Sequence, residues 1–217
     1  MSTESSGATR QVLSSAALLA LVAMLGTGLL AAVNDLTHER IAEQERQVMI
    51  RQLSQVLPAG AYDNEPIEDS LSIIDGSLSG QDEAVRVFRA RKGATPVAVV
   101  FDHVAPDGYN GDIHLLTGIL ADGRISGVRV VSHKETPGLG DPIEVERDDW
   151  ILGFNGRSLK DPGISDWAVK RDGGVFDQFT GATITPRAVV EAVQRVLEYH
   201  QSKGDTLYQQ TEQAGDE

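Results

Sequence analysis

Two short segments of this chain carry residues whose types and spacing could bind a phosphorylated ligand. The first is Thr180-Gly-Ala-Thr183, directly before a predicted helix start at Thr185-Pro186. Gly181 permits a tight turn and a close approach of another group, because it has no Cβ. Amide N–H groups at the positive end of a helix favour a phosphate, and the threonine hydroxyls could donate hydrogen bonds or be esterified. On these residues alone, an ordinary helix-capping turn is the simpler interpretation.

The second segment is the loop His133-Lys-Glu-Thr-Pro-Gly-Leu-Gly-Asp141, which follows a predicted strand. Pro137 fixes the backbone at one point, whereas Gly138 and Gly140 leave it free at two others. Such a loop can present backbone N–H and C=O groups beside a flat ligand. A plain connection is the alternative, although long loops of this composition often carry function in compact domains.

Histidine and tryptophan side chains are the remaining candidates for a ligand site. His103, His114 and His133 lie near predicted strand ends, but their spacing is not that of metal ligands on a helix, and the chain has no cysteine. We therefore expect no metal site. Trp150 and Trp167 could stack on a planar cofactor, but a place in the core is the simpler expectation for both.

Length and composition fit one ordinary domain with an additional segment. The chain has 217 residues, no cysteine and a formal net charge of −13. The negative charge argues against nucleic-acid binding, which needs a basic surface to neutralise phosphates. Without cysteine there can be no disulfide, thiolate-held iron–sulfur cluster or C-x-x-C-H haem attachment. If this protein moves electrons, it needs some other cofactor.

An uncharged apolar run from Val12 to Val33 is typical of a membrane-spanning helix. At ~1.5 Å per residue, a run of this length covers the ~30 Å hydrocarbon core of a bilayer. A cleaved signal peptide is the alternative, with Leu30-Ala-Ala32 as a loose cleavage site. We predict a retained anchor, because the run is longer than a usual signal core and a polar helix follows it. Arginines on both sides leave the orientation undecided, and the short N-terminal flank favours a cytoplasmic tail.

The rest of the chain is predicted to be an α+β domain on a helical stem. A charged helical pattern continues from the apolar run to Pro58-Ala-Gly60. Alternating or apolar runs of β-forming residues then predict strands. The clearest are Val85–Arg91, Pro96–Val104, Ile113–Leu120 and Ile125–Ser132.

Turn and cap signals complete the predicted organisation. Asp122-Gly123 predicts a hairpin turn, and Trp167–Arg171 suggests a further strand. We expect Thr185 to cap a helix with Pro186 at its first position, and Gly204 to end it. The predicted parts are a cytoplasmic tail at 1–11, a transmembrane helix at 12–33, a helical stalk at 34–60, a folded domain at 61–204 and a polar disordered tail at 205–217.

Taken together, these segments resemble the G subunit of Rnf-type ion-translocating oxidoreductase complexes, an FMN-binding domain family. The resemblance covers most of the chain: the apolar span and the segments Leu57–Asn64, Gly108–Ile113, Glu135–Asp141 and Asp177–Thr183. The last segment is the most specific. It is similar to the family's flavin-attachment signature, which is Asp, two variable residues, Ser or Thr, and then Gly-Ala-Thr.

The resemblance implies a covalently bound FMN and the residues that hold it. Thr183 would carry the FMN through a phosphoester made by a dedicated flavin transferase. Thr180, Gly181 and Ala182 would form the attachment turn, and Asp177 would serve transferase recognition or turn geometry. The loop would contact the isoalloxazine ring through Glu135, Thr136, Pro137, Gly138, Leu139 and Gly140. No catalytic residue is expected in this chain.

The resemblance also implies a role that this chain cannot complete alone. It would relay electrons within a bacterial inner-membrane complex that couples redox chemistry between ferredoxin and a nicotinamide to ion movement. Its partners would be integral membrane subunits and an iron–sulfur subunit, with the flavin domain facing the periplasm. One alternative is the homologous C subunit of a sodium-pumping quinone reductase. Another is a membrane-tethered binding or scaffold domain without a cofactor.

Overall fold

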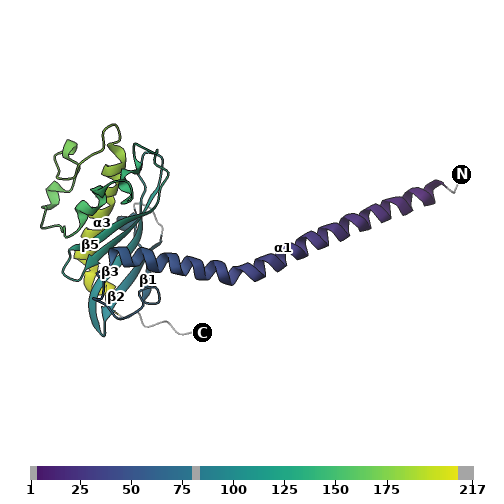
Figure 1. Ribbon diagram of the computed structural model, residues 1–217, viewed down its shortest axis with the longest axis horizontal. Helices are drawn as coiled ribbons and strands as arrows, with labels where there is room; N and C mark the ends of the chain where they lie inside the picture. Colours follow the sequence, from purple (N-terminus) through teal and green to yellow (C-terminus); the bar gives the residue numbers. More distant parts are fainter. Residues whose placement is uncertain (1–3, 80–83, 210–217) are drawn as a thin grey trace. The chain divides into compact units, whose positions relative to one another are not determined.

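The computed structural model describes residues 4–79 and 84–209 (Figure 1). Residues 210–217, which belong to the predicted disordered tail, therefore lie outside the described part of the chain. The elements in order are helix α1 (Glu4–Val56), strand β1 (Ser70–Ile74), helix α2 (Gly76–Ser79), strands β2 (Ala84–Lys92), β3 (Thr95–Ala105), β4 (Ile113–Leu120) and β5 (Ile125–Ser132), the 3₁₀ turns η1 (Asp141–Ile143), η2 (Asp149–Phe154), η3 (Ile164–Asp166) and η4 (Lys170–Asp172), and helix α3 (Ile184–Leu207).

The chain divides into two compact units, Met1–Val48 and Met49–Glu217. The first contains helix α1 as far as Val48, and the helix continues into the second unit to Val56. It is helical from Glu4 onward, through the predicted tail, span and most of the predicted stalk. This helix is long and apolar enough to cross a membrane, and its large apolar side chains, such as Leu19 and Leu30, are exposed. Exposed leucines in a continuous helix are what a lipid environment favours.

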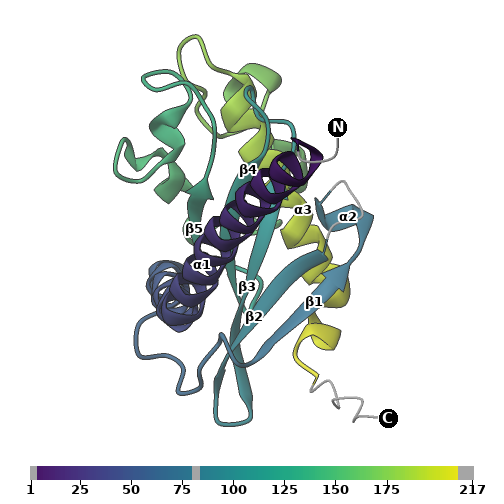
Figure 2. The same ribbon diagram turned by 90° about the vertical axis from the view of Figure 1, so that its right-hand side faces the viewer.

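The second unit is built on a five-stranded antiparallel sheet in the order β1-β2-β3-β4-β5 (Figure 2). The α+β prediction is confirmed, and the predicted strands at 113–120 and 125–132 match β4 and β5. Strand β1 was not predicted, because it is short and pairs only with β2 at the edge of the sheet. The suggested strand at Trp167–Arg171 is wrong, because Lys170–Asp172 forms the 3₁₀ turn η4. The turn expected at Asp172-Gly-Gly174 is present, with Gly173 at a φ of +92°. Only an isolated bridge between Val169 and Phe176 forms there.

Helix α3 covers one face of the sheet and forms the main hydrophobic core with it (Figure 2). Its apolar stripe, which includes Val189, Val193 and Val196, is fully buried against the sheet. One polar pair lies within this core, where His103 of β3 and Thr117 of β4 hydrogen-bond at 2.9 Å. Burial, with a smaller effect of the Arg195 charge, lowers the pKa of His103 to about 3. His103 is therefore a neutral core residue at physiological pH.

The end of helix α1 packs against the opposite face of the sheet. Leu53, Val56 and Leu57 are buried there in a second apolar cluster. Residues 49–60 therefore belong to the globular unit, although they were predicted as part of the stalk at 34–60. The physical reason is that these leucines and valine cover an apolar sheet face that would otherwise be exposed to water.

Two paired glycines let the helix backbone reach the sheet. Gly118 of β4 and Gly127 of β5 are directly opposite each other. A Cβ built on Gly118 would lie 2.6 Å from the Val56 carbonyl oxygen, and one on Gly127 would lie 3.0 Å from Val56 Cα. The Ser126 hydroxyl donates a hydrogen bond of 2.5 Å to the Val56 carbonyl, which lies at the helix end, where intrahelical donors run out. The helix end is thus held at one point on the sheet.

Helix α3 continues through Gly204 to Leu207, so the prediction that it ends at Gly204 is wrong. Two arginines of β2 hold the end of the helix. Arg89 donates to the Gln209 carbonyl and Arg91 to the Tyr208 carbonyl, each at 2.7 Å. Asp69 pairs with both arginines. Residues 205–209, which were expected in a disordered tail, are therefore ordered by cationic partners at the negative end of the helix.

The glycine contact predicts that Gly118→Ala destabilises the globular unit. The added methyl group would overlap the Val56 carbonyl, so the helix end must move away from the sheet. We expect a loss of about 1–3 kcal/mol in the free energy of unfolding. Urea denaturation of the detergent-solubilised chain, followed by tryptophan fluorescence, measures this loss. Gly153→Ala is the control, since nothing lies within 4 Å of a Cβ there. Equal stability of the two variants would contradict the prediction.

Candidate functional site

Three segments that are far apart in the sequence meet at one end of the sheet. Because neighbouring strands are antiparallel, the end of β3, the start of β4 and the end of β5 lie at the same end of the sheet. The β3–β4 connection, the loop after β5 and the turn before α3 enclose a cavity of about 230 Å³. The residues that line it are Tyr109, Glu135, Thr136, Leu139, Gly140, Gly181, Ala182, Thr183, Ile184 and Thr185.

A buried carboxylate joins these three segments. The side chain of Glu135 accepts a hydrogen bond at Oε1 from the Asn110 backbone N–H, at 2.9 Å. Its Oε2 accepts a short hydrogen bond from the hydroxyl of Thr185, in the first turn of α3. Asn110 also donates from Nδ2 to the Thr136 hydroxyl oxygen at 3.1 Å. Glu135 therefore fixes the walls of the cavity relative to one another.

Glycines are required where these segments approach closely. A Cβ on Gly140 would lie 2.8 Å from Glu135 Cβ and 3.1 Å from the Thr185 hydroxyl oxygen. Gly181 adopts a φ of +82° in the turn before the helix, a conformation that other residues rarely reach. The sequence interpretation of Gly181 as a tight-turn residue is therefore confirmed. Gly140 has a different function, because its missing side chain gives Glu135 room to reach α3.

The start of helix α3 differs from the prediction. Its N-cap is Thr183 and its first residue is Ile184, so Thr185 and Pro186 lie at the second and third positions. Thr185 does not cap the helix, because its hydroxyl donates to buried Glu135 instead. The side chain of Thr183 makes no capping hydrogen bond either, and it is half-buried at the wall of the cavity. Its hydroxyl is therefore available for another chemical role.

Four of the predicted site residues do not line the cavity: Pro137, Gly138, Asp177 and Thr180. Gly138 shapes the loop with a φ of +78°, and its N–H donates to Asp141 at 2.6 Å. Asp177 forms an exposed ion pair of 2.5 Å with Lys170. The Asp177 carbonyl also accepts a 2.8 Å hydrogen bond from the Trp150 indole. Asp177 therefore orients the segment that leads to Thr183 from outside the cavity.

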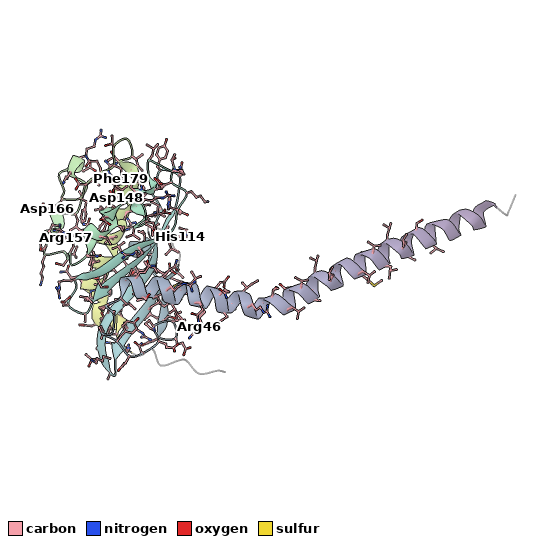
Figure 3. The ribbon with its side chains drawn as sticks, viewed as in Figure 1. Arg46, His114, Asp148, Arg157, Asp166 and Phe179 are labelled. Atoms are coloured by element: carbon pink, nitrogen blue, oxygen red, sulfur yellow. The ribbon has the colours of Figure 1, made fainter. Side chains whose placement is uncertain are left out.

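An aromatic cluster packs beside this segment. The Trp150 ring meets Phe154 and Phe179 edge to face, and its backbone N–H donates to Asp148. Phe179 and Asp148 are labelled in Figure 3. Trp167 is buried beside Phe154 in the same cluster. Neither tryptophan lines the cavity, so both belong to the support of the site. Tyr109, in contrast, lines the cavity although sequence reasoning did not single it out as a site residue.

The histidines are dispersed in the described part of the chain. His103 lies in the core, and His133 pairs with Glu144 at 2.9 Å. His114 is exposed on β4. Among residues 4–79 and 84–209, no three metal-binding side chains gather around a common point.

Comparison with known proteins identifies the class to which this fold and cavity belong. A family model described as an FMN-binding domain matches residues 108–198, which include all the segments around the cavity. A second one, described as the RnfG N-terminal region, matches residues 1–56. With the apolar helix α1, these matches define a membrane-anchored protein with an FMN-binding domain.

The particular family follows from full-length relatives, each named as the G subunit of an ion-translocating oxidoreductase complex. The protein from Pseudomonas aeruginosa (strain UCBPP-PA14) is 48% identical over 96% of this chain and 97% of its own length. The protein from Shewanella loihica is 48% identical over 91% of this chain and 93% of its own length. The protein from Vibrio cholerae (strain M66-2) is 42% identical over 89% of this chain and 92% of its own length. The chain belongs to this family of G subunits, as its motifs suggested, and is a subunit of an electron-transport complex.

The residues around the cavity fit an FMN group. Thr183 brings a hydroxyl to the N-terminus of a helix of 24 residues, where unpaired N–H groups and the helix dipole favour a phosphate. Thr136 offers a second hydroxyl, and the loop from Glu135 to Gly140 adds backbone groups. Tyr109, Leu139 and Ile184 supply apolar surface for a flat ring. The cavity therefore offers both the polar and the apolar contacts that such a cofactor needs.

The network around Glu135 predicts that Thr185→Val destabilises the domain. Valine keeps the shape of threonine but leaves one oxygen of a buried carboxylate without its donor. We expect a loss of about 1–3 kcal/mol in the free energy of unfolding, measured by urea denaturation. The matched control is Thr180→Val, because Thr180 lies outside the cavity and is not buried. A Thr185 variant as stable as the Thr180 variant would show that the hydrogen bond is unimportant.

Proposed function

We propose that this chain is the electron-relay subunit of its complex and carries FMN as a phosphoester on Thr183. The observation that supports this most directly is the position of Thr183 at the start of α3. Its hydroxyl makes no capping hydrogen bond and lies at the cavity wall. The helix N-terminus would stabilise the phosphoester by only ~0.3–1 kcal/mol, so the covalent bond retains the cofactor.

Each wall of the cavity has a separate part in this proposal. Glu135, through Asn110 and Thr185, holds the attachment turn at a fixed position relative to the loop after β5. Thr136 and the backbone groups up to Gly140 orient the edge of the ring. FMN, when bound, supplies the capacity to accept and pass on electrons, while the protein determines its position and electrostatic surroundings.

Asp177 and Thr180 lie outside the cavity, on the segment that leads to the attachment residue. Asp177 is exposed and so accessible to another protein, and its ion pair with Lys170 fixes the local backbone. We propose that a flavin transferase contacts this side and supplies a flavin dinucleotide as donor. Thr183 Oγ1 loses its proton and gains the bond to the flavin-bearing phosphorus, while the bond between the two phosphates of the donor breaks and the other nucleotide leaves as a monophosphate with the proton. The product would exceed the unmodified chain by the mass of FMN less one water.

The partners and location follow from the same proposal. The helix within residues 12–33 would anchor the chain in the bacterial inner membrane, with residues 1–11 in the cytoplasm and the flavin domain in the periplasm. Integral membrane subunits and an iron–sulfur subunit would exchange electrons with it. The complex would couple electron transfer between ferredoxin and a nicotinamide to ion transport. The chain alone would not complete a turnover.

We predict that Thr183→Ala abolishes covalent flavin when the protein is made together with a flavin transferase. The parent should be yellow and fluoresce in a denaturing gel, with the added mass on the peptide that contains Thr183. Thr206→Ala is the matched control, because it removes an exposed threonine hydroxyl near the C-terminal end of α3, outside both the cavity and the attachment motif. A colourless parent under these conditions would reject the relay function and favour a scaffold domain. Fluorescence retained by Thr183→Ala would place the attachment elsewhere.

The proposed topology predicts opposite results for two reporter fusions. Alkaline phosphatase, which is active only in the periplasm, should be active after Glu217. A green fluorescent protein, which folds poorly when exported through the general secretory pathway, should remain dark at that position. The reverse pattern would place the flavin domain in the cytoplasm.

A further inference from the structure

Exposed apolar side chains of the globular unit are concentrated around one cavity. In the described part of the chain outside α1, the exposed large hydrophobic residues are Ile74, Tyr109, Leu139, Ile164, Val175 and Ile184. Three of these six, Tyr109, Leu139 and Ile184, line the cavity at Thr183. Single apolar residues at a surface need no explanation, but three that converge on one cavity indicate a ligand with an apolar surface.

Tyr109 is the most exposed of the three, at 66% of its surface, although its backbone is tightly fixed. A Cβ on the preceding residue, Gly108, would collide with the Gly111 carbonyl oxygen. Gly111 itself adopts a φ of +108°. On the other side of Tyr109, Asn110 is held by Glu135 and Thr136. The chain therefore fixes the backbone of this tyrosine, while its side chain lines the cavity and stays largely exposed.

The residues that line the cavity are of two kinds. Thr136 and Thr183 carry hydroxyls and Glu135 carries a carboxyl group, whereas Tyr109, Leu139 and Ile184 carry a ring or aliphatic groups. A cofactor whose phosphate is attached at Thr183 needs polar partners at its tethered end. Its flat ring system then requires an apolar partner, and an aromatic side chain provides the largest contact area.

We infer that Tyr109 is the aromatic contact of the isoalloxazine ring, with Leu139 and Ile184 as its aliphatic neighbours. The inference rests on the proposed attachment of FMN to Thr183. It adds a positioning residue from the β3–β4 connection, outside the two segments that carry the sequence motifs. Because Asn110 belongs to the Glu135 network, the same carboxylate sets the positions of the attachment residue and of the aromatic contact.

This contact has a spectroscopic signature that does not depend on activity. A phenol in van der Waals contact with a photoexcited flavin donates one electron to it and regains that electron during decay, so the flavin emits less light. Phenylalanine and leucine cannot donate an electron in this way, whereas tryptophan can. Unfolding removes the contact and restores emission in every variant.

The test compares native and denatured flavin fluorescence of the purified holoprotein with Tyr109 replaced by Phe, Leu or Trp. We expect Tyr109→Phe and Tyr109→Leu to raise native fluorescence several-fold per bound flavin, and Tyr109→Trp to keep it low. Denatured fluorescence per flavin should be the same in all. The matched control is Tyr62→Phe, which removes the hydroxyl of a tyrosine that packs against the second apolar cluster and does not line the cavity. It should leave native fluorescence unchanged.

Two unfavourable outcomes are distinguishable by mass spectrometry of the Thr183 peptide. If the peptide carries FMN and the Phe and Leu variants emit like the parent, Tyr109 does not contact the ring and this inference is overturned alone. If the parent peptide carries no FMN, the proposed function is overturned and the inference with it. Loss of FMN from the Leu variant only would support a positioning role, with the conservative Phe variant then reporting the quenching.

Discussion

The hydrogen bonds of Glu135 are the interaction on which the arrangement of the site depends. A carboxylate that is only 5% exposed would be costly without partners, and here Asn110 and Thr185 supply them from two other segments. Three segments that are far apart in the sequence are thereby fixed relative to one another at one end of the sheet. Gly140 makes this possible, since any side chain there would occupy the space between Glu135 and Thr185.

The two faces of the sheet serve different requirements of the protein. Helix α3 covers one face, contributes the main core and directs its N-terminus toward the cavity. The last residues of α1 cover the other face, where Gly118 and Gly127 admit the helix backbone and Ser126 binds its final carbonyl. The segment that leaves the membrane anchor is thus part of the folded domain. A cofactor attached at Thr183 would lie at the start of α3, and α3 is packed against the sheet.

The individual elements were largely predictable because they depend on local patterns. Runs of β-forming residues predicted β4 and β5, and the glycine in the attachment turn predicted the tight turn that Gly181 makes with a φ of +82°. Errors occurred where a contact distant in sequence outweighs a local preference. Thr185 has the residue type and position of a helix cap, but its hydroxyl binds Glu135, fifty residues away. Gly204 is a typical end signal, but Arg89 and Arg91 hold the chain beyond it. Strand β1 has too few residues to give a clear pattern.

The class of the protein could be recognised from its residues: an apolar helix, an α+β domain, a threonine in a specific motif and no cysteine with which to hold a metal cluster. These properties reside in contiguous residues, so they can be recognised without the fold. Which of those residues meet depends on the three-dimensional fold. It brought Glu135 to Thr185 and Tyr109 to the cavity of Thr183, and it left Asp177 and Thr180 outside. The physical reason is that antiparallel strand ends place distant loops side by side, and buried hydrogen bonds then select their relative positions.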